Sequence, residues 1–587
     1  MRQVLTSDPD RRNRPPSHRK PRDFYRWGRR FCLPIASVAV ACVQIAFAAE
    51  PAVEWWQNAV IYEIYPRSFA DSNGDGIGDL NGITQHLDYL RDLGVDAIWI
   101  TPFYPSPQVD FGYDISDYQA IDPQYGTMAD FDRLVAEAKK RKIRVITDLV
   151  LNHTSDQHPW FVESRSSRTN PKADWYMWRD GKPGNRPPNN WLAIFGHSAW
   201  EFEPKRGQLY YHAFYREQPD LNWTKREVRN AVYDMMRFWM KRGVAGFRLD
   251  AVTSLFEDPQ LRDEPVARPG VNNYGDPILT RQYTDNLPEC HNVLRELRQV
   301  TDGFPGRVLI GETYLPNIQE LAKMYGARND ELHLPMDTQF AFSPLSADEF
   351  RSRLRDAETA LNGHAPLFFF DNHDNPRSWT RYADHRNDAA IAKLLATVLM
   401  TPRCSALMYY GEEIGMENND PKRKEDVRDP IGKSGWPREK GRDGERTPMQ
   451  WDAAANAGFS TAKTTWLAAA PGYTTRNVAA ETRDPDSLLN YYKALIRLRK
   501  TNTALRDGDF ALINESDKNV LAFTRRAKDG TTVLVALNFT AVPQTTSFNI
   551  GGTQAATLLS SFSKSGQTVS LKNLVLPGYG GFVGRVQ

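Results

Sequence analysis

The sequence predicts an α/β protein: a (β/α)8 TIM barrel with an inserted domain after the third strand and an all-β sandwich domain at the C-terminus. Three observations lead to this fold class. Apolar strand-like segments alternate with helical patterns from residue 59, eight such segments occur, and short alternating strands replace the helices beyond about residue 505. Strands that alternate with helices form right-handed βαβ units and a parallel sheet. Eight units favour a closed barrel over a doubly wound sheet.

The first units show the alternation clearly. AVIYEIYP at 59–66 precedes apolar residues at helical spacing and then the strand-like VDAIWITP at 95–102. Thr127 can cap a helix that leads into IRVITDLV at 143–150, and another helical pattern leads into VAGFRLDAV at 244–252. The other expected strands are RVLIGET (307–313), LHLPMDT (332–338), PLFFFDNHD (366–374) and SALMYYGEEIG (405–415).

The N-terminus has the features of an export signal. About 30 basic, Pro-rich residues precede an apolar run at 31–48 that ends in Ala46-Phe47-Ala48. This order favours a signal peptide over a membrane span, because the run contains Pro34 and is near the short end of the roughly 17–25 residues that a span needs. We therefore expect an exported, periplasmic or extracellular protein without a stable membrane span; an uncleaved anchor or a lipid on Cys42 are the alternatives.

Length and composition are consistent with several folded domains. At about 150 residues per domain, 587 residues allow three or four. The expected parts are a signal peptide at 1–48, the barrel at 49–151 and 224–504, an inserted domain B at 152–223 and the C-terminal β domain at 505–587. A charged excursion at 416–446 is expected to be mostly a solvated loop, although it could rim a pocket entrance.

Charge and cysteine content exclude some classes. The chain has 74 Lys and Arg against 72 Asp and Glu, a net charge of +2, so a general polyanion-binding role such as nucleic-acid binding is not expected. Without the signal peptide only Cys290 and Cys404 remain, either both buried and free or joined in one bridge. Two cysteines do not make a disulfide scaffold.

Carboxylates end several of the expected strands. In a parallel barrel the loops after the strands form the active site. Grouping Asp250, Glu312 and Asp374 on one rim is costly unless chemistry uses them, and it separates their pKa values into acid and base roles. Cleavage of a glycosidic bond needs such a set. The polar strand-end residues are Asp148, His153, Arg248, Asp250, Glu312, His373 and Asp374.

A short loop places oxygen donors at alternate positions. The segment DSNGDGIGD at 71–79 suits a hard cation, and we expect a structural Ca²⁺, with Mg²⁺ possible. It differs from an EF-hand, because Gly82 occupies the twelfth position and the loop follows a strand. A solvated acidic turn is the alternative. The expected ligands are the side chains of Asp71, Asn73, Asp75 and Asp79 and the carbonyl of Ile77.

Several motifs occur in a characteristic order: IYPRSF, GYDISDY, DLVLNHTSDQHPWF, QPDLNW, GFRLDAV, IGET, FDNHDNPR and RTPMQWD. From about residue 53 to the C-terminus the chain resembles the α-amylase superfamily, glycoside hydrolase family 13, and most of all its α-glucosidase and oligo-1,6-glucosidase branch. The resemblance implies retaining cleavage through a covalent glycosyl-enzyme intermediate. By motif, Asp250 is the nucleophile, Glu312 the general acid and base, and Asp374 the residue that grips sugar hydroxyls.

The resemblance also implies substrate contacts. His153 and His373 bond hydroxyls of the glucose being cleaved, and Arg248 helps to keep Asp250 ionised from the same strand face. A wall at the non-reducing end makes a pocket that selects chain ends. The residues of that wall and of the inserted domain are Asp110, Tyr113, Arg442, Phe195 and Gln218.

We therefore expect an exo-acting retaining α-glucosidase that acts on short oligosaccharides or disaccharides. Ala251 stands where a Val accompanies α-1,6 preference in this branch, which favours α-1,4 (maltose-type) or sucrose-type substrates. A sugar isomerase, a trehalose synthase or a transglucosylase on the same scaffold are the alternatives. Intact Asp250, Glu312 and Asp374 disfavour a non-catalytic transporter partner or a carbohydrate-binding protein.

Overall fold

A parallel sheet of eight strands forms the centre of the protein in a computed structural model that describes residues 54–587. The expected signal peptide and Cys42 lie outside the described residues. The strand order is β11-β10-β7-β3-β2-β1-β13-β12, and a parallel bridge between Met336 and Leu367 connects the two edges, so the barrel nearly closes. The strands are β1 (Val60–Ile64), β2 (Ala97–Ile100), β3 (Arg144–Val150), β7 (Gly246–Asp250), β10 (Val308–Gly311), β11 (Leu334–Pro335), β12 (Leu367–Phe369) and β13 (Ser405–Tyr409).

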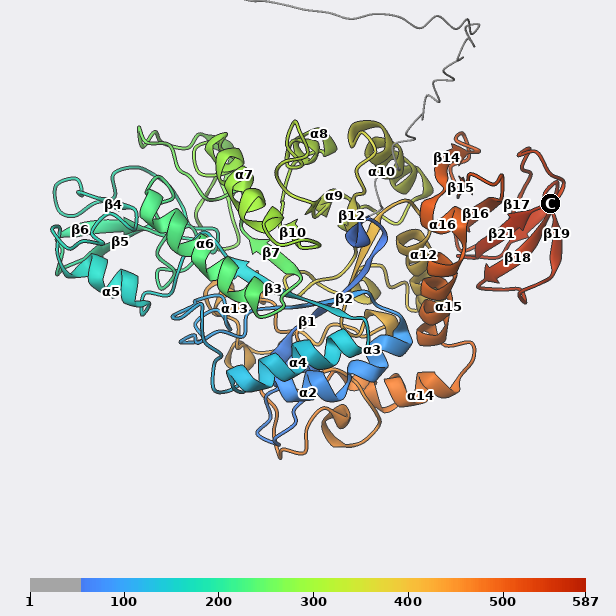
Figure 1. Cartoon of the computed structure of the whole chain (residues 1–587), viewed down its shortest axis with the longest axis horizontal. Helices are drawn as coiled ribbons and strands as arrows, with labels where there is room; N and C mark the ends of the chain where they lie inside the picture. The colour runs from blue at the N-terminus through green and yellow to red at the C-terminus, as the bar shows by residue number, and fades with distance from the viewer. Residues whose placement is uncertain (1–53) are drawn as a thin grey trace, which may run out of the picture. The chain divides into compact units, whose positions relative to one another are not determined.

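Each of these strands lies within a segment that the sequence predicts as a strand, so the predicted fold class is confirmed. Helices cover the outside of the sheet (Figure 1). The helices outside the insert are α1 (Pro66–Phe69), α2 (Leu80–Gln85), α3 (Leu87–Leu93), α4 (Met128–Lys140), α6 (Arg226–Lys241), α7 (Glu289–Asp302), α8 (Ile318–Lys323), α9 (Thr338–Ala341), α10 (Ala347–Ala360), α11 (Ser378–Arg381), α12 (Asp388–Met400), α13 (Pro430–Gly435), α14 (Val478–Arg483), α15 (Leu488–Thr501) and α16 (Thr503–Asp507).

Local sequence explains where these helices begin and which face they bury. Thr127 caps α4 in a capping box with Asp130, and Phe131 and Leu134 are buried on the inner face of that helix. Gly243, with φ +101, follows α6 and lets the chain turn back into β7. This alternation brings the carboxyl ends of all eight strands to one rim.

The predicted insert carries its own small sheet. Between β3 and α6 lie α5 (Pro159–Ser166), β4 (Trp178–Arg179), β5 (Trp200–Glu203) and β6 (Gln208–Tyr211), and the strands pair antiparallel in the order β4-β6-β5 (Figure 1). Trp191, Trp200 and Tyr211 form part of its separate apolar core. A bridge between His153 and Asp220 ties the beginning of this segment to its end.

The C-terminal part is an antiparallel β domain. Six strands pair in the order β14-β15-β16-β21-β18-β19, and a second sheet of β17 and β20 shares an apolar core with them. Arg351 Nη2 of α10 donates to the Val520 carbonyl at 2.7 Å, which ties this domain to the barrel. The strands are β14 (Asp509–Ile513), β15 (Val520–Arg526), β16 (Thr532–Asn538), β17 (Gln544–Thr546), β18 (Gln554–Ser560), β19 (Thr568–Ser570), β20 (Leu574–Leu576) and β21 (Gly581–Val586).

One element was not expected. A hairpin of β8 (Val266–Val271) and β9 (Pro277–Leu279) projects from the long segment between β7 and α7. Its strand β8 is exposed along its whole length, so it lacks the alternation that marks a strand resting on a core. Residues of this segment line a cavity at the carboxyl ends of the strands.

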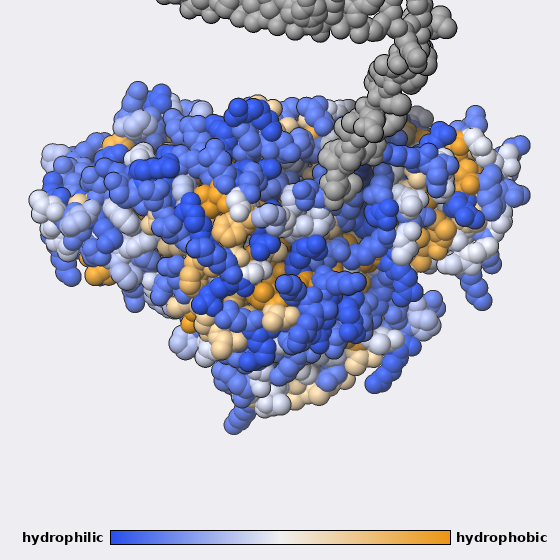
Figure 2. Space-filling view, viewed as in Figure 1, coloured by the Kyte–Doolittle hydropathy of each residue, from blue (hydrophilic) through white to orange (hydrophobic). Residues whose placement is uncertain are grey.

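Two other expectations concern the cysteines and the membrane. Cys290 and Cys404 are both buried and free, so the first of the two alternatives holds. No helix between residues 54 and 587 combines the length and the apolar character that a membrane span needs. Figure 2 shows a mostly hydrophilic face with hydrophobic residues in small, separate patches.

Candidate active site

Arg248 is the centre of the candidate active site. It is fully buried in β7, and its Nη1 lies 2.6 Å from Asp250 Oδ1 and 3.1 Å from Asp148 Oδ1. Its Nη2 lies 2.7 Å from Glu312 Oε1 at the end of the neighbouring strand β10. The structure thus brings Asp250 and Glu312 together on one guanidinium.

Burial has a larger effect on the pKa values of Asp250 and Glu312 than the charge of Arg248 that they share. Burial raises the pKa of Asp250 to about 7, although Arg248 pulls it down. Burial likewise raises the pKa of Glu312 to about 7, against the effect of Arg248. Two interacting carboxyls titrate as a pair, so the pair holds one proton near neutral pH. One carboxylate and one carboxylic acid are then available side by side.

The residue after Asp250 has an unusual backbone conformation. Ala251 adopts φ +47, in the left-handed region, and its N–H donates to Glu312 Oε2 at 3.1 Å. Non-glycine residues in this region are uncommon and concentrate at functional sites. The turn at Ala251 therefore helps to hold Glu312 next to Asp250.

Asp374 has the opposite electrostatic environment. Its Oδ1 accepts from Arg442 Nη1 at 2.9 Å and from Arg446 Nη2 at 3.0 Å, and its Oδ2 lies 3.1 Å from His373 Nε2. Burial acts to raise the pKa of Asp374, but the contact with His373 and the charges of Arg442 and Arg446 hold it below its ordinary value. Asp374 is therefore ionised at neutral pH.

A buried carboxyl that the sequence did not single out orients His373. Glu63 Oε1 of β1 lies 2.6 Å from His373 Nδ1. Burial raises the pKa of Glu63 and lowers the pKa of His373. A protonated Glu63 then donates to Nδ1, and the Nε2–H of the neutral ring donates to Asp374.

The far end of the site is closed by Arg442. Its Nη2 lies 2.6 Å from Asp110 Oδ1, and its Nε lies 2.7 Å from Asp429 Oδ2. Gln218 Nε2 donates to Asp110 Oδ2 at 3.2 Å, and the Arg442 guanidinium lies 5.5 Å from the centre of the Phe195 ring. The residues predicted to form this wall therefore lie together.

His153 and Tyr113 complete the predicted set. The ring of Tyr113 stacks on His373 with centroids 5.2 Å apart, and its hydroxyl donates to Asp148 Oδ2 at 3.0 Å. Burial lowers the pKa of His153 to about 3, so the ring is neutral. Asn152 Oδ1 lies 2.9 Å from His153 Nδ1 and fixes the orientation of the ring.

These side chains enclose a cavity of about 580 Å³ at the carboxyl ends of the strands. Gln218 and Arg248 lie behind its wall, where they bond residues that line it. The other predicted catalytic and substrate-binding residues line it: Asp110, Tyr113, His153, Phe195, Asp250, Glu312, His373, Asp374 and Arg442.

The excursion at 416–446 differs in part from the expectation of a solvated loop. Residues 422–426 are exposed, as expected. Ile431, Glu439 and Arg442 line the cavity, and Asp429 is fully buried. A buried guanidinium is stable only when carboxylates pair with it. The ion pairs of Arg442 with Asp110, Asp374 and Asp429 therefore hold the second half of the segment in place. Sequence reasoning missed Asp429 because it lies in a run of charges without any apolar pattern.

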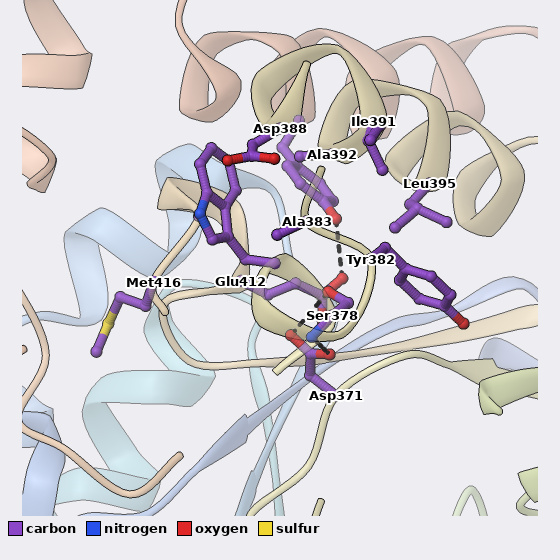
Figure 3. A pocket seen from close by; sticks show the side chains of 13 residues that line it. Asp371, Ser378, Tyr382, Ala383, Asp388, Ile391, Ala392, Leu395, Glu412 and Met416 are labelled. Atoms are coloured by element: carbon purple, nitrogen blue, oxygen red, sulfur yellow. Dashed lines mark hydrogen bonds between the residues drawn. The ribbon is translucent and has the colours of Figure 1, made fainter. Parts of the chain in front are cut away.

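A second, smaller cavity lies behind the loop that carries His373 and Asp374. It measures about 20 Å³, room for about one water molecule and too little for a sugar. Figure 3 shows Asp371 and Ser378 joined by hydrogen bonds at this cavity, and Ser378 Oγ donates to Asp371 Oδ2 at 3.0 Å. This contact joins the two ends of the loop that carries His373 and Asp374.

The loop at 71–79 is wound around its own acidic side chains. Asp71 accepts from the N–H groups of Asn73, Gly74 and Gly76, and these bonds act to lower its pKa although burial raises it. Asp79 caps α2 by accepting from Gly82 N. Between residues 54 and 587 no three His, Cys, Asp or Glu side chains cluster as a metal site. The donors are nevertheless all oxygens, which fits a hard cation in kind.

Comparisons with known proteins agree with this geometry. A family model for the alpha amylase catalytic domain matches residues 63–508. A probable alpha-glucosidase of Rhizobium meliloti (strain 1021) is 46% identical over 490 residues, which cover 81% of this chain and 88% of the relative. An oligo-1,6-glucosidase of Heyndrickxia coagulans is 40% identical over 519 residues, which cover 83% of this chain and 92% of the relative.

Solved structures show the same likeness. The alpha-glucosyl transfer enzyme XgtA is 39% identical with a TM-score of 0.84, covering 91% of this chain and 100% of that chain. The trehalulose synthase MutB of Pseudomonas mesoacidophila MX-45 is 38% identical with a TM-score of 0.83, covering 92% of this chain and 100% of that chain.

A parallel barrel with paired buried carboxyls beside a closed pocket defines a glycoside hydrolase. The chain belongs to the alpha-amylase family, glycoside hydrolase family 13, and the resemblance seen in its motifs is confirmed.

Proposed function

We propose that the protein is an exo-acting, retaining α-glucosidase that releases terminal non-reducing glucose from short α-linked substrates, with maltose-type or sucrose-type linkages preferred. The ion pair between Asp110 and Arg442 is the observation that carries this proposal. It closes one end of the cavity, so a chain end can enter but a chain cannot pass through.

The reaction divides between Asp250 and Glu312. Asp250 attacks the anomeric carbon, the glycosidic C–O bond breaks, and the leaving oxygen takes the proton of Glu312. Glu312 then removes a proton from water, which attacks the same carbon and frees Asp250. Two displacements return the original anomeric configuration. The common guanidinium of Arg248 supports this assignment, because retaining enzymes need the two carboxyl groups close together, about 5–5.5 Å apart.

Asp374 acts on the charge that develops between these steps. An ionised carboxylate next to the sugar ring stabilises the positive oxocarbenium character of the transition state. Arg442 and Arg446 keep Asp374 ionised, and His373 and His153 supply further polar contacts to the same ring. The binding energy of the glucose is thus directed to the bond being cleaved.

The names of the relatives support two readings of the reaction. Curated relatives are called alpha-glucosidase, oligo-1,6-glucosidase and maltase, whereas structural relatives are called an alpha-glucosyl transfer enzyme and a trehalulose synthase. A sugar isomerase, trehalose synthase or transglucosylase is therefore the alternative. It would use the same covalent intermediate but pass the glucosyl group to a sugar instead of water.

Product analysis tests the proposal. The purified mature protein is incubated with maltose, isomaltose, sucrose and trehalose, and the products are separated by anion-exchange chromatography. Free glucose as the main product from maltose or sucrose supports hydrolysis, and rearranged disaccharides as the main product would overturn it. The variant Asp250→Asn should lose nearly all turnover; activity that survives it would refute the nucleophile.

Two further proposals concern regions outside the cavity. We infer that the loop at 71–79 binds a structural Ca²⁺, with Mg²⁺ as the alternative ion, through Asp71, Asn73, Asp75, Ile77 and Asp79.

We also infer that residues 1–48 direct export of the protein, which N-terminal sequencing of secreted material can test.

A further inference from the structure

Most charged side chains that line the cavity have a partner in the protein. On the glucose side, Arg442 joins Asp110 and Asp374, and Asp250 and Glu312 share Arg248. On the opposite side, two further carboxylates are also engaged. Asp285 Oδ1 accepts from Ser254 Oγ at 3.2 Å, and Glu439 accepts from Asn273 Nδ2 and from Gly441 N, each at 3.1 Å.

Arg281 is different. It lines the same cavity, and its charge acts on Asp220 and Tyr211 at longer range. Among residues 54–587, however, its side chain makes no direct hydrogen bond or ion pair. Its Nε is buried without a partner. Burying part of a guanidinium without an acceptor costs free energy, and an acceptor that arrives with a ligand would recover that cost.

Arg281 comes from a segment that does not form the closed glucose end, and we take it to face the leaving group. Asp110, Arg442 and Phe195 close the glucose end. Arg281 instead belongs to the long segment between β7 and α7 that carries the β8–β9 hairpin. The turn of this hairpin is tied to the opposite wall, because Asn273 Nδ2 donates to Glu439 Oε2.

A second tie holds the turn to the inserted domain. His197 N donates to Asp276 Oδ2 at 2.7 Å. The Tyr274 ring also packs against Gly196, where an added Cβ would lie 2.4 Å from Tyr274 Cγ. The segment that carries Arg281 is therefore held against both neighbouring walls.

We propose that the leaving-group half of the cavity takes an anionic aglycone, a carboxylate or phosphate on the group that leaves, and that Arg281 binds it. This inference rests on the proposed α-glucosidase function and deepens it. A guanidinium suits both anions because it can donate two parallel hydrogen bonds. Asp285 and Glu439 also line the cavity, but neither bonds Arg281; their hydrogen bonds come from Ser254, Asn273 and Gly441.

The test compares aryl glucosides with charged and neutral leaving groups. Because the ester is also the better leaving group, the role of Arg281 is judged from how the ratio between substrates changes from one enzyme to another. The substrates are 4-carboxyphenyl α-glucoside, its neutral methyl ester and 4-phosphonophenyl α-glucoside, and the two anions distinguish a carboxylate from a phosphate. The enzymes are the wild type, Arg281→Gln and the control Arg268→Gln, whose side chain lies on the exposed strand β8. Each is assayed for kcat/KM, and for maltose hydrolysis as a check on the proposed function.

We expect the wild type to prefer at least one anion over the ester by about tenfold or more, as a charge-assisted hydrogen bond allows. Arg281→Gln should bring that ratio to about 1, and Arg268→Gln should leave it unchanged. Raising the ionic strength should lower the wild-type ratio.

Three results would overturn the inference: a wild-type preference for the ester, an equal loss for all substrates in Arg281→Gln, or the same change in Arg268→Gln. If maltose and every aryl glucoside resist hydrolysis, the proposed function itself fails. If the ester and maltose are hydrolysed without any anion preference, only the role of Arg281 fails.

Discussion

Arg442 reaches Asp110 across 332 positions of the chain, and its Nη2 lies 2.6 Å from Asp110 Oδ1. The same guanidinium also bonds Asp374 and Asp429. One side chain therefore closes the pocket, keeps the carboxylate of Asp374 ionised and holds the excursion at 416–446 in place. Only an arginine has the planar fork of donors that these three contacts use.

Replacing Arg442 by lysine tests whether its positive charge alone is sufficient or whether its three contacts are also required. Arg442→Lys keeps the positive charge but cannot bond three carboxylates, so Asp374 shifts from its position. We expect kcat/KM for maltose to fall about 10²-fold, the order of loss that a displacement of about 1 Å produces. Steady-state kinetics measures the change. Arg91→Lys, at an exposed pair with Asp88, is the matched control and should stay within about twofold, as exposed pairs contribute little. Near wild-type activity in Arg442→Lys would show that the wall is not needed.

The barrel could be predicted because its strands are apolar runs that end in distinctive polar residues. The hairpin at 266–279 could not, because β8 is exposed throughout and therefore carries no alternating pattern. Its position depends on contacts with residues far along the chain, such as the one between Asn273 and Glu439. Such contacts leave no local signal in a sequence.

The candidate site also contains residues that the sequence predicts and residues that it does not. Asp250, Glu312 and Asp374 were predicted because each ends a strand within a motif. Glu63 was not, because it lies within a short apolar strand and its partner His373 is 310 positions away. Arg281 was also missed, since a lone arginine in a polar loop normally points into solvent.

The environment of Glu312 predicts how activity depends on pH. Burial raises the pKa of Glu312 to about 7, so the proton that the leaving group needs is present below that pH and is lost above it. We expect kcat/KM for maltose to decline about tenfold per pH unit on the alkaline side. On the acid side activity should also fall, because the pair takes up a second proton and Asp250 is no longer a nucleophile.

A substrate that needs no acid provides the control for this pH dependence. α-Glucosyl fluoride releases fluoride without protonation. Glu312→Gln should therefore lose most activity on maltose but keep a first turnover on the fluoride, and that step should show no alkaline decline. An unchanged alkaline decline in the variant would assign the titration to another group.

We expect Glu63 to be a positioning residue that acts through its contact with His373. Glu63→Leu removes the donor to Nδ1 and leaves the ring free to turn, so kcat/KM should fall about 10-fold to 100-fold, as for other groups that orient a histidine. Glu63→Gln keeps an N–H donor of similar shape and should recover most of the loss. Kinetics at several pH values, with calorimetry, separates this role from mere stability. Equal losses in both variants, together with lower melting temperatures, would indicate a structural role only.

The loop at 71–79 predicts a metal-dependent stability. If Ca²⁺ binds there, chelation should lower the melting temperature, because a ligand that binds only the folded state stabilises it by about 3–4 kcal/mol at 100–1,000 times its Kd. Calorimetry of the chelated protein, followed by addition of Ca²⁺ or Mg²⁺, measures the shift and identifies the ion. Asp75→Asn should reduce the response, and Asp117→Asn, at an exposed site, should not. A melting temperature that chelation leaves unmoved would refute the proposed site.

We expect linkage preference to depend on Ala251, the residue next to Asp250. Ala251 lines the cavity beside Asp250 and bonds Glu312 through its N–H, so a larger side chain there narrows the space where the leaving sugar begins. We expect Ala251→Val to shift the ratio of kcat/KM for isomaltose over maltose upward by about 10-fold to 200-fold, the range that small changes of shape produce in an apolar contact. The two disaccharides are assayed with each enzyme under the same conditions, and Ala251→Ser serves as the control of similar size. Because Ala251 has a positive φ, a branched side chain also strains the backbone, which the melting temperature reports separately. If the ratio of isomaltose to maltose activity is unchanged and the variant folds normally, another part of the cavity determines the linkage preference.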